Sequence, residues 1–327
     1  MTSPDLPSDL RAALERLGEG LSRRDTAQRA ARMSATYRGG GGSQSILDAQ
    51  GALAYVFTRM PATYAALSGC FAAIGDSYPG FAPTSLLDVG AGPGTAAWAA
   101  AESFASLRDF TLLDANSALR SLALRLSQDN ARLHAIDYRL GDAQTMLAEA
   151  PDADLVTASY IVGELNEKAR LALAQGMWRR TRDILLIVEP GTPSGYARII
   201  ELRDALIAAG AHIVAPCPHE ADCPLQPPDW CHFSRRLARL RDHKQIKGAE
   251  LPFEDEKFSY IALSRTTATQ RGSRILAVPR MTKTAVTTKL CTADGLALAI
   301  APRRDRPAYA QARKRRWGDL VRFQGIS

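Results

Sequence analysis

Short apolar runs alternate with longer segments of helical composition through the middle of the chain. Each run ends near glycine, proline or an acidic residue, and the segments between the runs mix apolar and charged residues as amphipathic helices do. The runs lie within residues 85–89, 110–115, 134–144, 153–165 and 183–193. This alternation predicts an α/β fold built on a doubly wound parallel sheet, with ligand groups at the carboxyl ends of the strands.

The first apolar run ends in a glycine turn, within SLLDVGAGPGTAAW at residues 85–98. A strand, a tight turn and a helix follow one another here, and the helix is expected to begin at Thr95. Glycines let the backbone approach a bound ligand, and a helix N-terminus offers free N–H groups. The second run ends in Asp114, twenty residues after Gly94, where a carboxylate can accept hydrogen bonds from two ribose hydroxyls. A nucleoside-containing cofactor is therefore predicted.

An acidic residue before the glycines indicates which nucleoside-containing cofactor to expect. The motif D-x-G-x-G-x-G that begins at Asp88 lacks the G-x-G-x-x-G spacing and resembles motif I of class I S-adenosylmethionine methyltransferases. That resemblance implies that the glycine turn lies against the methionine part, that Asp88 organises the turn, and that Asp142 and Ala143 border the adenine. The expected cofactor-binding residues are Asp88, Gly90, Gly92, Gly94, Thr95, Asp114, Asp142, Ala143 and Ser159.

No catalytic group is evident after the fourth apolar run. Methyltransferases that act on exocyclic amines usually carry Asn/Asp-Pro-Pro-Tyr/Phe there, whereas this chain reads SYIV at residues 159–162. Enzymes that methylate cytosine C5 need a nucleophilic cysteine after the fourth or fifth strand, and none lies there. Glu164 and Glu189 are candidate bases, but each fits a structural acid as well. The catalytic residues stay unassigned.

Three of the five cysteines lie within fifteen residues, in the proline-rich segment APCPHEADCPLQPPDWCHF at 215–233. A fourth candidate ligand is Cys291, whereas Cys70 lies in an apolar stretch typical of a buried small residue. Four thiolates suit either zinc or an iron–sulfur cluster. His219 and His232 are alternative ligands within the segment.

The local sequence favours an iron–sulfur cluster but leaves zinc open. Cys217 and Cys223 are each followed by proline, as a ligand cysteine is in one common cluster-binding run, and no C-x2-C pair of a zinc ribbon appears. The segment follows an expected helix at 195–210 and strand at 212–216, and it precedes an expected strand at 257–265. Because the last two strands of class I methyltransferases are antiparallel, the cysteines are predicted to form an insertion between strands six and seven.

Composition is that of an ordinary globular protein. The chain has 327 residues, of which 46% are hydrophobic and 23% are charged, and no apolar run approaches the roughly 20 residues that span a bilayer. The first twenty residues lack a secretory signal and are too acidic for a typical mitochondrial transit peptide. We therefore expect a cytoplasmic protein without membrane association, in which clustered cysteines favour metal over disulfide.

Positive charge is concentrated toward the C-terminus. Residues 265–327 contain 14 Lys and Arg against 3 Asp and Glu, while the whole chain has a net charge of +7. A basic region predicts a polyanionic partner, foremost nucleic acid, and a solubilising tail is the alternative. The expected organisation is a helical region at 1–80, a methyltransferase-like domain at 81–265 with a cysteine insertion at 215–250, and a basic extension at 266–327.

Six segments together resemble the methyltransferase-like assembly factors of the mitochondrial small ribosomal subunit and their bacterial relatives. They are AYVFTRMPATYAAL (54–67), LLDVGAGPGT (86–95), VEPGTPSGY (188–196), APCPHEADCPL (215–225), WCHFSRR (230–236) and KLCTADG (289–295). The proline-flanked cysteine segment is the most specific of them. The resemblance implies a class I methyltransferase fold that carries a [4Fe–4S] cluster on Cys217, Cys223, Cys231 and Cys291.

The same resemblance implies binding to the immature small ribosomal subunit and its rRNA, in agreement with the basic C-terminal region, and no DNA partner is expected. Eukaryotic members enter mitochondria, so the lack of an evident transit peptide favours a bacterial member. We expect an S-adenosylmethionine-binding, iron–sulfur protein that acts on the small ribosomal subunit by binding rRNA during subunit assembly or translation, with rRNA methylation as a candidate activity. The alternatives are an assembly factor without catalysis, a cluster-dependent sensor, and structural zinc in place of the cluster.

Overall fold

The structure is a computed structural model of the chain, and it describes residues 6–19, 28–29, 46–238, 253–268 and 270–322. The chain divides into two compact units. Unit 1 comprises Met1–Gly69, Ala82–Ile187 and Arg235–Glu256, and unit 2 comprises Cys70–Phe81, Val188–Ser234 and Lys257–Ser327.

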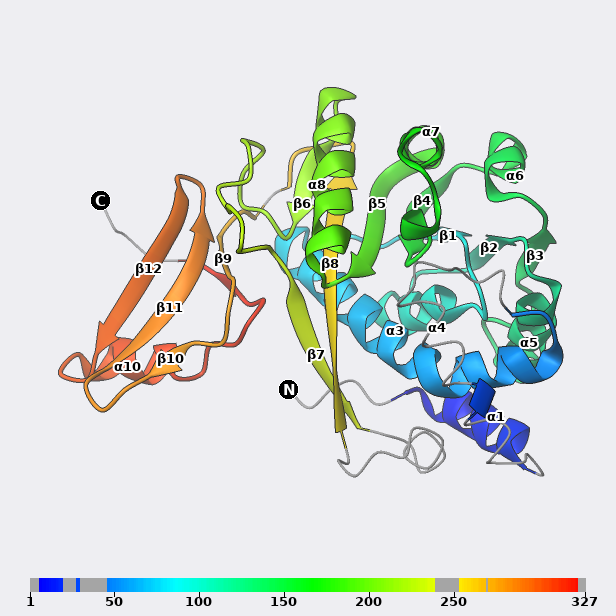
Figure 1. Cartoon of the computed structure of the whole chain (residues 1–327), viewed down its shortest axis with the longest axis horizontal. Helices are drawn as coiled ribbons and strands as arrows, with labels where there is room; N and C mark the ends of the chain where they lie inside the picture. The colour runs from blue at the N-terminus through cyan, green and yellow to red at the C-terminus, as the bar shows by residue number, and fades with distance from the viewer. Residues whose placement is uncertain (1–5, 20–27, 30–45, 239–252, 269, 323–327) are drawn as a thin grey trace. The chain divides into compact units, whose positions relative to one another are not determined.

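One eight-stranded sheet contains every strand predicted between residues 85 and 265 (Figure 1). Its strands are β1 (Ser85–Val89), β2 (Asp109–Asp114), β3 (Asp137–Leu140), β4 (Ala153–Ser159), β5 (Thr181–Pro190), β6 (His212–Ala215), β7 (Phe233–Ala238) and β8 (Phe253–Ser264). They are hydrogen-bonded in the order β3-β2-β1-β4-β5-β8-β6, and β7 pairs with β8. β1 is parallel to β2 and β4, and β6 is antiparallel to β8. This topology confirms the class I methyltransferase fold.

Helices precede and connect the strands of this sheet, and several of them begin at polar capping residues. They are α1 (Ser8–Gly18), α3 (Ala49–Ser77), α4 (Thr95–Ser103), α5 (Ser117–Ser127), α6 (Ala143–Glu149), the 3-10 helix η2 (Val162–Glu164), α7 (Glu167–Arg180) and α8 (Pro193–Ala208). The side chains of Asn116, Asp142, Asn166 and Thr192 each accept a hydrogen bond from a first-turn N–H of α5, α6, α7 and α8. No helix in the described ranges is long and apolar enough to cross a membrane.

The core of unit 1 lies along the central strands. Leu87 in β1, Leu155 and Val156 in β4, and Ile187 in β5 are fully buried. Long apolar runs of this kind are expected where helices cover both faces of a parallel sheet. Against this apolar background, a buried acidic residue near a strand end is unusual and marks the edge where a ligand site can form.

The basic C-terminal region folds as a second sheet, which the sequence interpretation described only as an extension. Its strands are β9 (Ser273–Ile275), β10 (Arg280–Met281), β11 (Ala285–Thr292), β12 (Gly295–Pro302) and β13 (Leu320–Val321). β11 pairs antiparallel with β10, β12 and β9. The short helix α10 (Arg306–Ala312) covers one face, where Ala312 packs with Val286 and Ala301.

Candidate functional site

The glycine turn after β1 is held in a left-handed conformation. Gly90, Gly92 and Gly94 have φ angles of 73°, 54° and 80°, which residues with a Cβ rarely adopt. Gly90 N and Ala91 N donate to Leu113 O of β2 at 2.8 and 3.1 Å, so the turn is fixed against the neighbouring strand. A Cβ on Gly92 would meet its nearest described neighbour, Leu119 Cδ1, at 4.0 Å, so the φ angle rather than crowding favours glycine there. The predicted strand, turn and helix are confirmed.

Asp114 binds this turn from the end of β2. Its Oδ2 accepts a hydrogen bond from Gly92 N at 2.8 Å, and its Oδ1 accepts one from Asn116 N at 2.7 Å. Burial raises the pKa of Asp114, and the backbone bonds from Asn116 and Gly92 oppose that rise. Each carboxylate oxygen keeps a further acceptor position, as bonds from ribose hydroxyls require. The ribose role stays a prediction.

Asp88 leaves one buried carboxylate oxygen without a partner. The residue is 1% exposed, its Oδ1 accepts a bond from Thr157 Oγ1 at 2.8 Å, and its Oδ2 has no hydrogen-bond partner within the described residues. Burial raises the pKa of Asp88 to about 7, the Thr157 hydroxyl lowers it, and Asp114 raises it further. Buried polar atoms are normally satisfied. A cofactor with a sulfonium and an ammonium group fits this acceptor, so the residues suit S-adenosylmethionine.

Tyr138 in β3 is a residue of this site that the sequence interpretation missed. Its buried hydroxyl donates to Gly92 O at 2.6 Å. Burial raises the pKa of the phenol, and the carboxyl groups of Asp114 and Asp88 add to the rise. Both backbone groups of Gly92 are therefore held, the N–H by Asp114 and the carbonyl by Tyr138. A tyrosine suits any β-strand, so no local pattern reveals this role.

The other predicted cofactor residues lie where β3 and β4 end. Asp142 is the N-cap of α6, and its Oδ1 accepts bonds from Thr145 N at 2.9 Å and Thr145 Oγ1 at 3.0 Å. Ala143 is the first residue of α6, and Ser159 is the last residue of β4. Parallel strands end at one edge of a sheet, so these positions share the edge with the glycine turn. Their contacts with a cofactor stay predictions.

A group of three side chains follows β4 at the expected catalytic position. Tyr160 has a φ of 61°, a conformation that costs a non-glycine residue on the order of 1–3 kcal/mol. Its hydroxyl donates to Glu256 Oε1 at 3.0 Å, and Arg59 Nη2 lies 3.3 Å from the same oxygen. Arg59 comes from α3 and Glu256 from β8, far from Tyr160 in the chain. No local sequence pattern could have identified this group.

The two candidate bases differ in their surroundings. Glu189 in β5 is fully buried, and its Oε2 lies 2.7 Å from Arg198 Nε. This buried ion pair matches a structural acid. Glu164 closes η2 and is exposed. Neither residue receives a catalytic assignment from these contacts.

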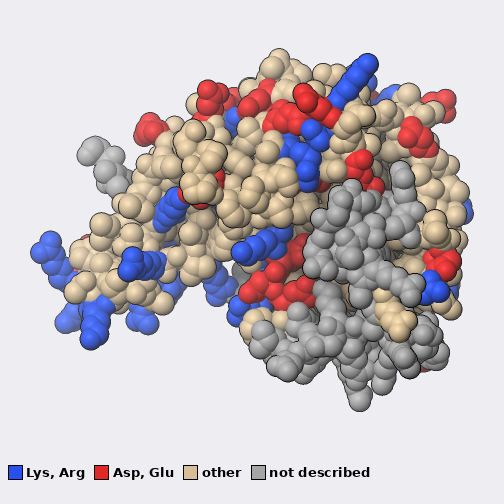
Figure 2. Space-filling view, viewed as in Figure 1, with Lys and Arg blue, Asp and Glu red and all other residues tan. Residues whose placement is uncertain are grey.

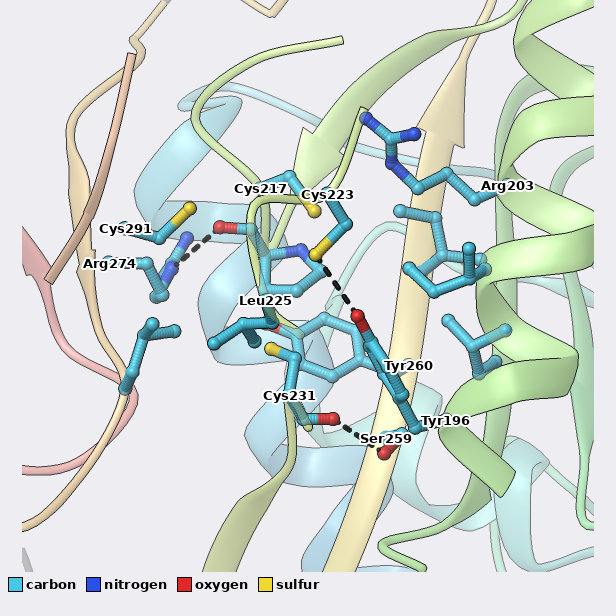
Figure 3. A pocket seen from close by; sticks show the side chains of 15 residues that line it. Tyr196, Arg203, Cys217, Cys223, Leu225, Cys231, Ser259, Tyr260, Arg274 and Cys291 are labelled. Atoms are coloured by element: carbon cyan, nitrogen blue, oxygen red, sulfur yellow. Dashed lines mark hydrogen bonds between the residues drawn. The ribbon is translucent and has the colours of Figure 1, made fainter. Parts of the chain in front are cut away.

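Four cysteines from separate segments line one cavity of unit 2 (Figure 3). Cys217 and Cys223 follow β6, Cys231 precedes β7, and Cys291 lies in β11. The cavity is also lined by Tyr196 and Arg203 of α8 and by residues of β8 and β9. Cys70 is buried in α3 and does not line the cavity, as predicted for a core residue. The structure thus brings the four predicted ligands together.

Burial raises the pKa of three of the four thiols in this cavity. It raises the pKa of Cys217, raises that of Cys231 well above its ordinary value, and raises that of Cys291 to about 12. Neighbouring cysteines add to each rise, because a second negative charge close by is unfavourable. The positive charge of Arg203 opposes the rise at Cys217 and Cys291. A thiophilic metal ion would displace the thiol protons on binding.

The two histidines adjoin the cavity without lining it. His219 Nε2 lies 3.5 Å from Cys291 Sγ, whereas the ring of His232 stacks on Trp230 at 5.0 Å and meets the edge of Trp317 at 4.8 Å. Burial lowers the pKa of both imidazoles. The ring of His232 is therefore part of an aromatic stack, and His219 is a neighbour of the four sulfur atoms.

The donor set suits a soft metal group, although a finished site is not formed. Across the described ranges, no three His, Cys, Asp or Glu side chains are arranged to hold a metal ion. The cavity nevertheless offers four thiols among largely apolar walls, with two buried arginines beside them. Thiolates select zinc or iron–sulfur clusters over harder ions. The iron–sulfur ligands stay a prediction.

Lys and Arg side chains gather over the part of the chain that carries β10, β11 and α10 (Figure 2). The exposed members are Arg280, Lys283, Arg303, Arg304, Arg306, Arg313, Lys314 and Arg316. Several of them flank α10, so the folded C-terminal sheet presents them as one basic surface, called here the basic sheet surface. Its partner stays a prediction.

Fold and site define a class I methyltransferase-like protein with an added four-cysteine cavity. The family "Mitochondrial small ribosomal subunit Rsm22" matches residues 49–322, and the chain belongs to this family. It is 30% identical over 292 residues to the human "Ribosome assembly protein METTL17, mitochondrial", covering 82% of this chain and 62% of that one. It is 25% identical over 330 residues to "Rsm22-cox11 tandem protein 2, mitochondrial" of Schizosaccharomyces pombe, covering 84% of this chain and 43% of that one.

The chain thus spans less than two thirds of the length of these curated relatives. Among solved structures, it is similar to magnesium protoporphyrin IX methyltransferase of Synechocystis PCC 6803 with bound SAH. That likeness has a TM-score of 0.43 and 10% identity, and covers 79% of this chain and 100% of the other.

Proposed function

We propose that this protein is an S-adenosylmethionine-binding, iron–sulfur assembly factor of the small ribosomal subunit. The observation that carries the proposal is the convergence of Cys217, Cys223, Cys231 and Cys291 on one cavity. Family membership supports the ribosomal part, because the human relative is named a ribosome assembly protein.

The glycine turn is the proposed cofactor cradle. S-adenosylmethionine, when bound, supplies an activated methyl group. Asp114 and Tyr138 hold the N–H and the carbonyl of Gly92, so the turn is already ordered before a ligand arrives. The unpaired Oδ2 of Asp88 offers a negative charge to a cationic ligand. Preorganisation of this kind lowers the entropic cost of binding.

The cysteine cavity is the proposed cluster site. A [4Fe–4S] cluster, when bound, supplies a multivalent crosslink and a redox-active charge. Five prolines lie between residues 216 and 228, and few apolar residues do, so this segment has little core of its own. Ligation by Cys217, Cys223 and Cys231 would anchor it, and Cys291 would tie it to β11. Folding of unit 2 would then depend on the metal group.

The basic sheet surface is the proposed contact with rRNA phosphates. Its exposed Lys and Arg side chains stand on a folded sheet and a helix rather than on an extended tail. Fixed positive charges on a rigid element suit a structured RNA backbone. The test is crosslinking in cells followed by sequencing of the bound RNA: enrichment of small-subunit rRNA supports the proposal, and a profile that follows total RNA contradicts it.

Methyl transfer to rRNA is a second candidate function, favoured by the strained Tyr160 beside Glu256 at the end of β4. Strained residues cluster at functional sites. Radiolabelled S-adenosylmethionine incubated with immature small-subunit particles tests it. Transfer of label that is lost in Tyr160→Ala supports turnover, and unlabelled particles with a fully loaded protein favour an assembly factor without catalysis.

A further inference from the structure

Two arginines lie buried beside the four cysteines. Arg203 in α8 and Arg274 in β9 are each 1% exposed and are among the largest fully buried side chains. Both line the cysteine cavity, and Figure 3 shows them on opposite sides of Cys217 and Cys223. Arginine is always charged at neutral pH and is almost never fully buried unless it is paired. Their burial here therefore requires an explanation.

Arg274 has only neutral partners. It donates to Pro216 O at 3.1 Å, to Gly318 O at 2.9 Å and to Ser77 Oγ at 3.4 Å. In the part of the chain that the structure describes, no carboxylate pairs with it. These bonds satisfy its N–H groups, but they leave its charge without a counter-charge.

Arg203 is compensated only in part. Its Nη2 donates to His219 O and Ala221 O, and its Nη1 lies 2.5 Å from the carboxylate of Asp204. Asp204 is 53% exposed, so water screens that pair. The Nε of Arg203 is buried and has no hydrogen-bond partner among the described residues. The cavity wall thus carries up to two positive charges in surroundings of low polarity.

A metal group on four thiolates has the matching charge. Four thiols are neutral near pH 7. Four thiolates around a core of charge +2, whether Zn²⁺ or an oxidised [4Fe–4S] core, carry a net charge of −2. A buried ion is tolerated when an opposite charge lies close to it, and an unpaired one costs several kcal/mol.

We propose that Arg203 and Arg274 are the counter-charges of a dianionic tetrathiolate metal group in this cavity. The inference rests on the proposed function of the four cysteines and assigns positioning residues to that site. Reduction of an iron–sulfur core adds one negative charge, so nearby guanidinium groups favour the reduced state and raise the reduction potential. In metal-free protein the charge of Arg274 is uncompensated and that of Arg203 is compensated only in part, so both oppose folding of unit 2.

A purely structural role makes a different prediction. If Arg274 served only to bind the carbonyls of Pro216 and Gly318, its loss would destabilise the protein equally with and without metal. As a counter-charge, its loss weakens the loaded form and leaves the metal-free form as stable as before or more so. The sign of the effect on metal-free protein therefore separates the two roles.

The experiment uses the full chain, purified anaerobically and reconstituted with iron and sulfide. Arg274→Gln removes the charge and keeps a polar side chain, Arg274→Lys keeps the charge, and Arg203→Gln tests the second site. Arg132→Gln is the matched control, because Arg132 also donates to backbone carbonyls, those of Phe104 and Leu107 in unit 1. The readouts are metal release to a chelator, the midpoint potential, and the melting temperature with and without metal.

For Arg274→Gln we expect metal release roughly 10–100-fold faster than wild type, as for other residues that support metal ligands. Its midpoint potential should be more negative, and its metal-free melting temperature should be unchanged or higher. Arg274→Lys should restore most of the potential, and Arg132→Gln should lower both melting temperatures equally without moving the potential. A wild-type potential in Arg274→Gln, with equal loss of stability in both forms, would overturn the proposal.

Two further outcomes are also decisive. If Arg274→Gln is insoluble, Arg274→Lys decides: wild-type potential and metal retention support the counter-charge, and loss of metal from this charged variant contradicts it. If the wild-type protein takes up zinc instead of iron, the cluster is wrong, and the zinc-release rates of the same variants still test the arginines. A wild-type protein that retains no metal contradicts both proposals.

Discussion

Asp114 Oδ2 accepts a hydrogen bond from Gly92 N at 2.8 Å, so an acid at the end of β2 fixes the glycine turn at the end of β1. Replacing Asp114 by Ala removes this bond together with the acceptor for ribose hydroxyls. We expect the affinity for S-adenosylmethionine to fall by about 1–3 kcal/mol in calorimetry. Asp109→Ala, at the exposed start of the same strand, is the control and should bind as wild type. Unchanged binding by Asp114→Ala would remove this residue from the cofactor site.

The unpaired carboxylate of Asp88 predicts how stability depends on pH. Its folded pKa of about 7 lies above the ordinary value of 3.8, so the folded state holds a proton that the unfolded state has lost between these two values. The stability contributed by this group is therefore fully present below about pH 3.8 and is lost as pH rises toward 7. Urea unfolding of wild type and Asp88→Asn at several pH values measures it.

We expect the difference in unfolding free energy between wild type and Asp88→Asn to become less favourable to wild type from pH 4 to pH 7. Ligand binding provides a second test of the raised pKa of Asp88. A cationic cofactor favours the ionised carboxylate, so wild type should release protons on binding near pH 6, seen by calorimetry in two buffers of different ionisation enthalpy. If the unfolding free energies of the two proteins changed equally with pH, the pKa of Asp88 would not be raised in the folded state.

Gly90 combines a left-handed backbone with a close neighbour. A Cβ there would lie 2.3 Å from Ile161 Cδ1, whereas a Cβ on Gly210, which has a similar φ of 86°, would meet nothing within 4 Å. Gly210→Ala should therefore lower the free energy of unfolding only by the cost of a left-handed backbone at a residue with a Cβ, about 1–2 kcal/mol. Gly90→Ala should cost a further 1–3 kcal/mol, roughly, from overpacking. Chemical denaturation measures both, and Ile161→Ala in the Gly90→Ala background should recover part of the loss. Equal costs at the two glycines would contradict the steric account.

The basic sheet surface predicts a salt dependence. Replacing Arg303, Arg304, Lys314 and Arg316 by Gln should weaken RNA binding and flatten the plot of log affinity against log salt, because fewer counterions are released. A matched set from unit 1, the exposed Arg125, Lys168, Arg179 and Arg182, should leave the slope unchanged. Filter binding with small-subunit rRNA at several salt concentrations is the measurement. An unaltered slope in the first set would show that these charges only solvate the surface.

The parallel sheet and the glycine turn were predictable because both are local. Each strand is indicated by its own short apolar run, and Gly94 and Asp114 lie only twenty residues apart. The second sheet was missed because its pattern is mixed: β11 buries Thr288 beside Val286 and Leu290, which weakens the apolar alternation.

Contacts between residues far apart in the sequence were the other feature that was hard to predict. Four cysteines could be named as a set because their chemistry is rare, although Cys291 lies sixty residues from Cys231. Arg203 and Arg274 could not be identified from the sequence, because an arginine in a helix or a strand ordinarily faces solvent. Their burial depends on how α8 and β9 line the cysteine cavity. Asp142 has a helix-capping role that the sequence interpretation did not assign, and its predicted position beside the adenine stays a prediction.

Metal analysis of anaerobically purified protein tests the central claim most directly. Wild type and Cys70→Ser should be brown, with broad absorption near about 400 nm and roughly four irons per chain, as a four-thiolate cubane requires. Cys291→Ser should lose the iron, because Cys291 lines the cysteine cavity from β11. A colourless wild-type protein with one stoichiometric zinc, even after reconstitution with iron and sulfide, would contradict the account.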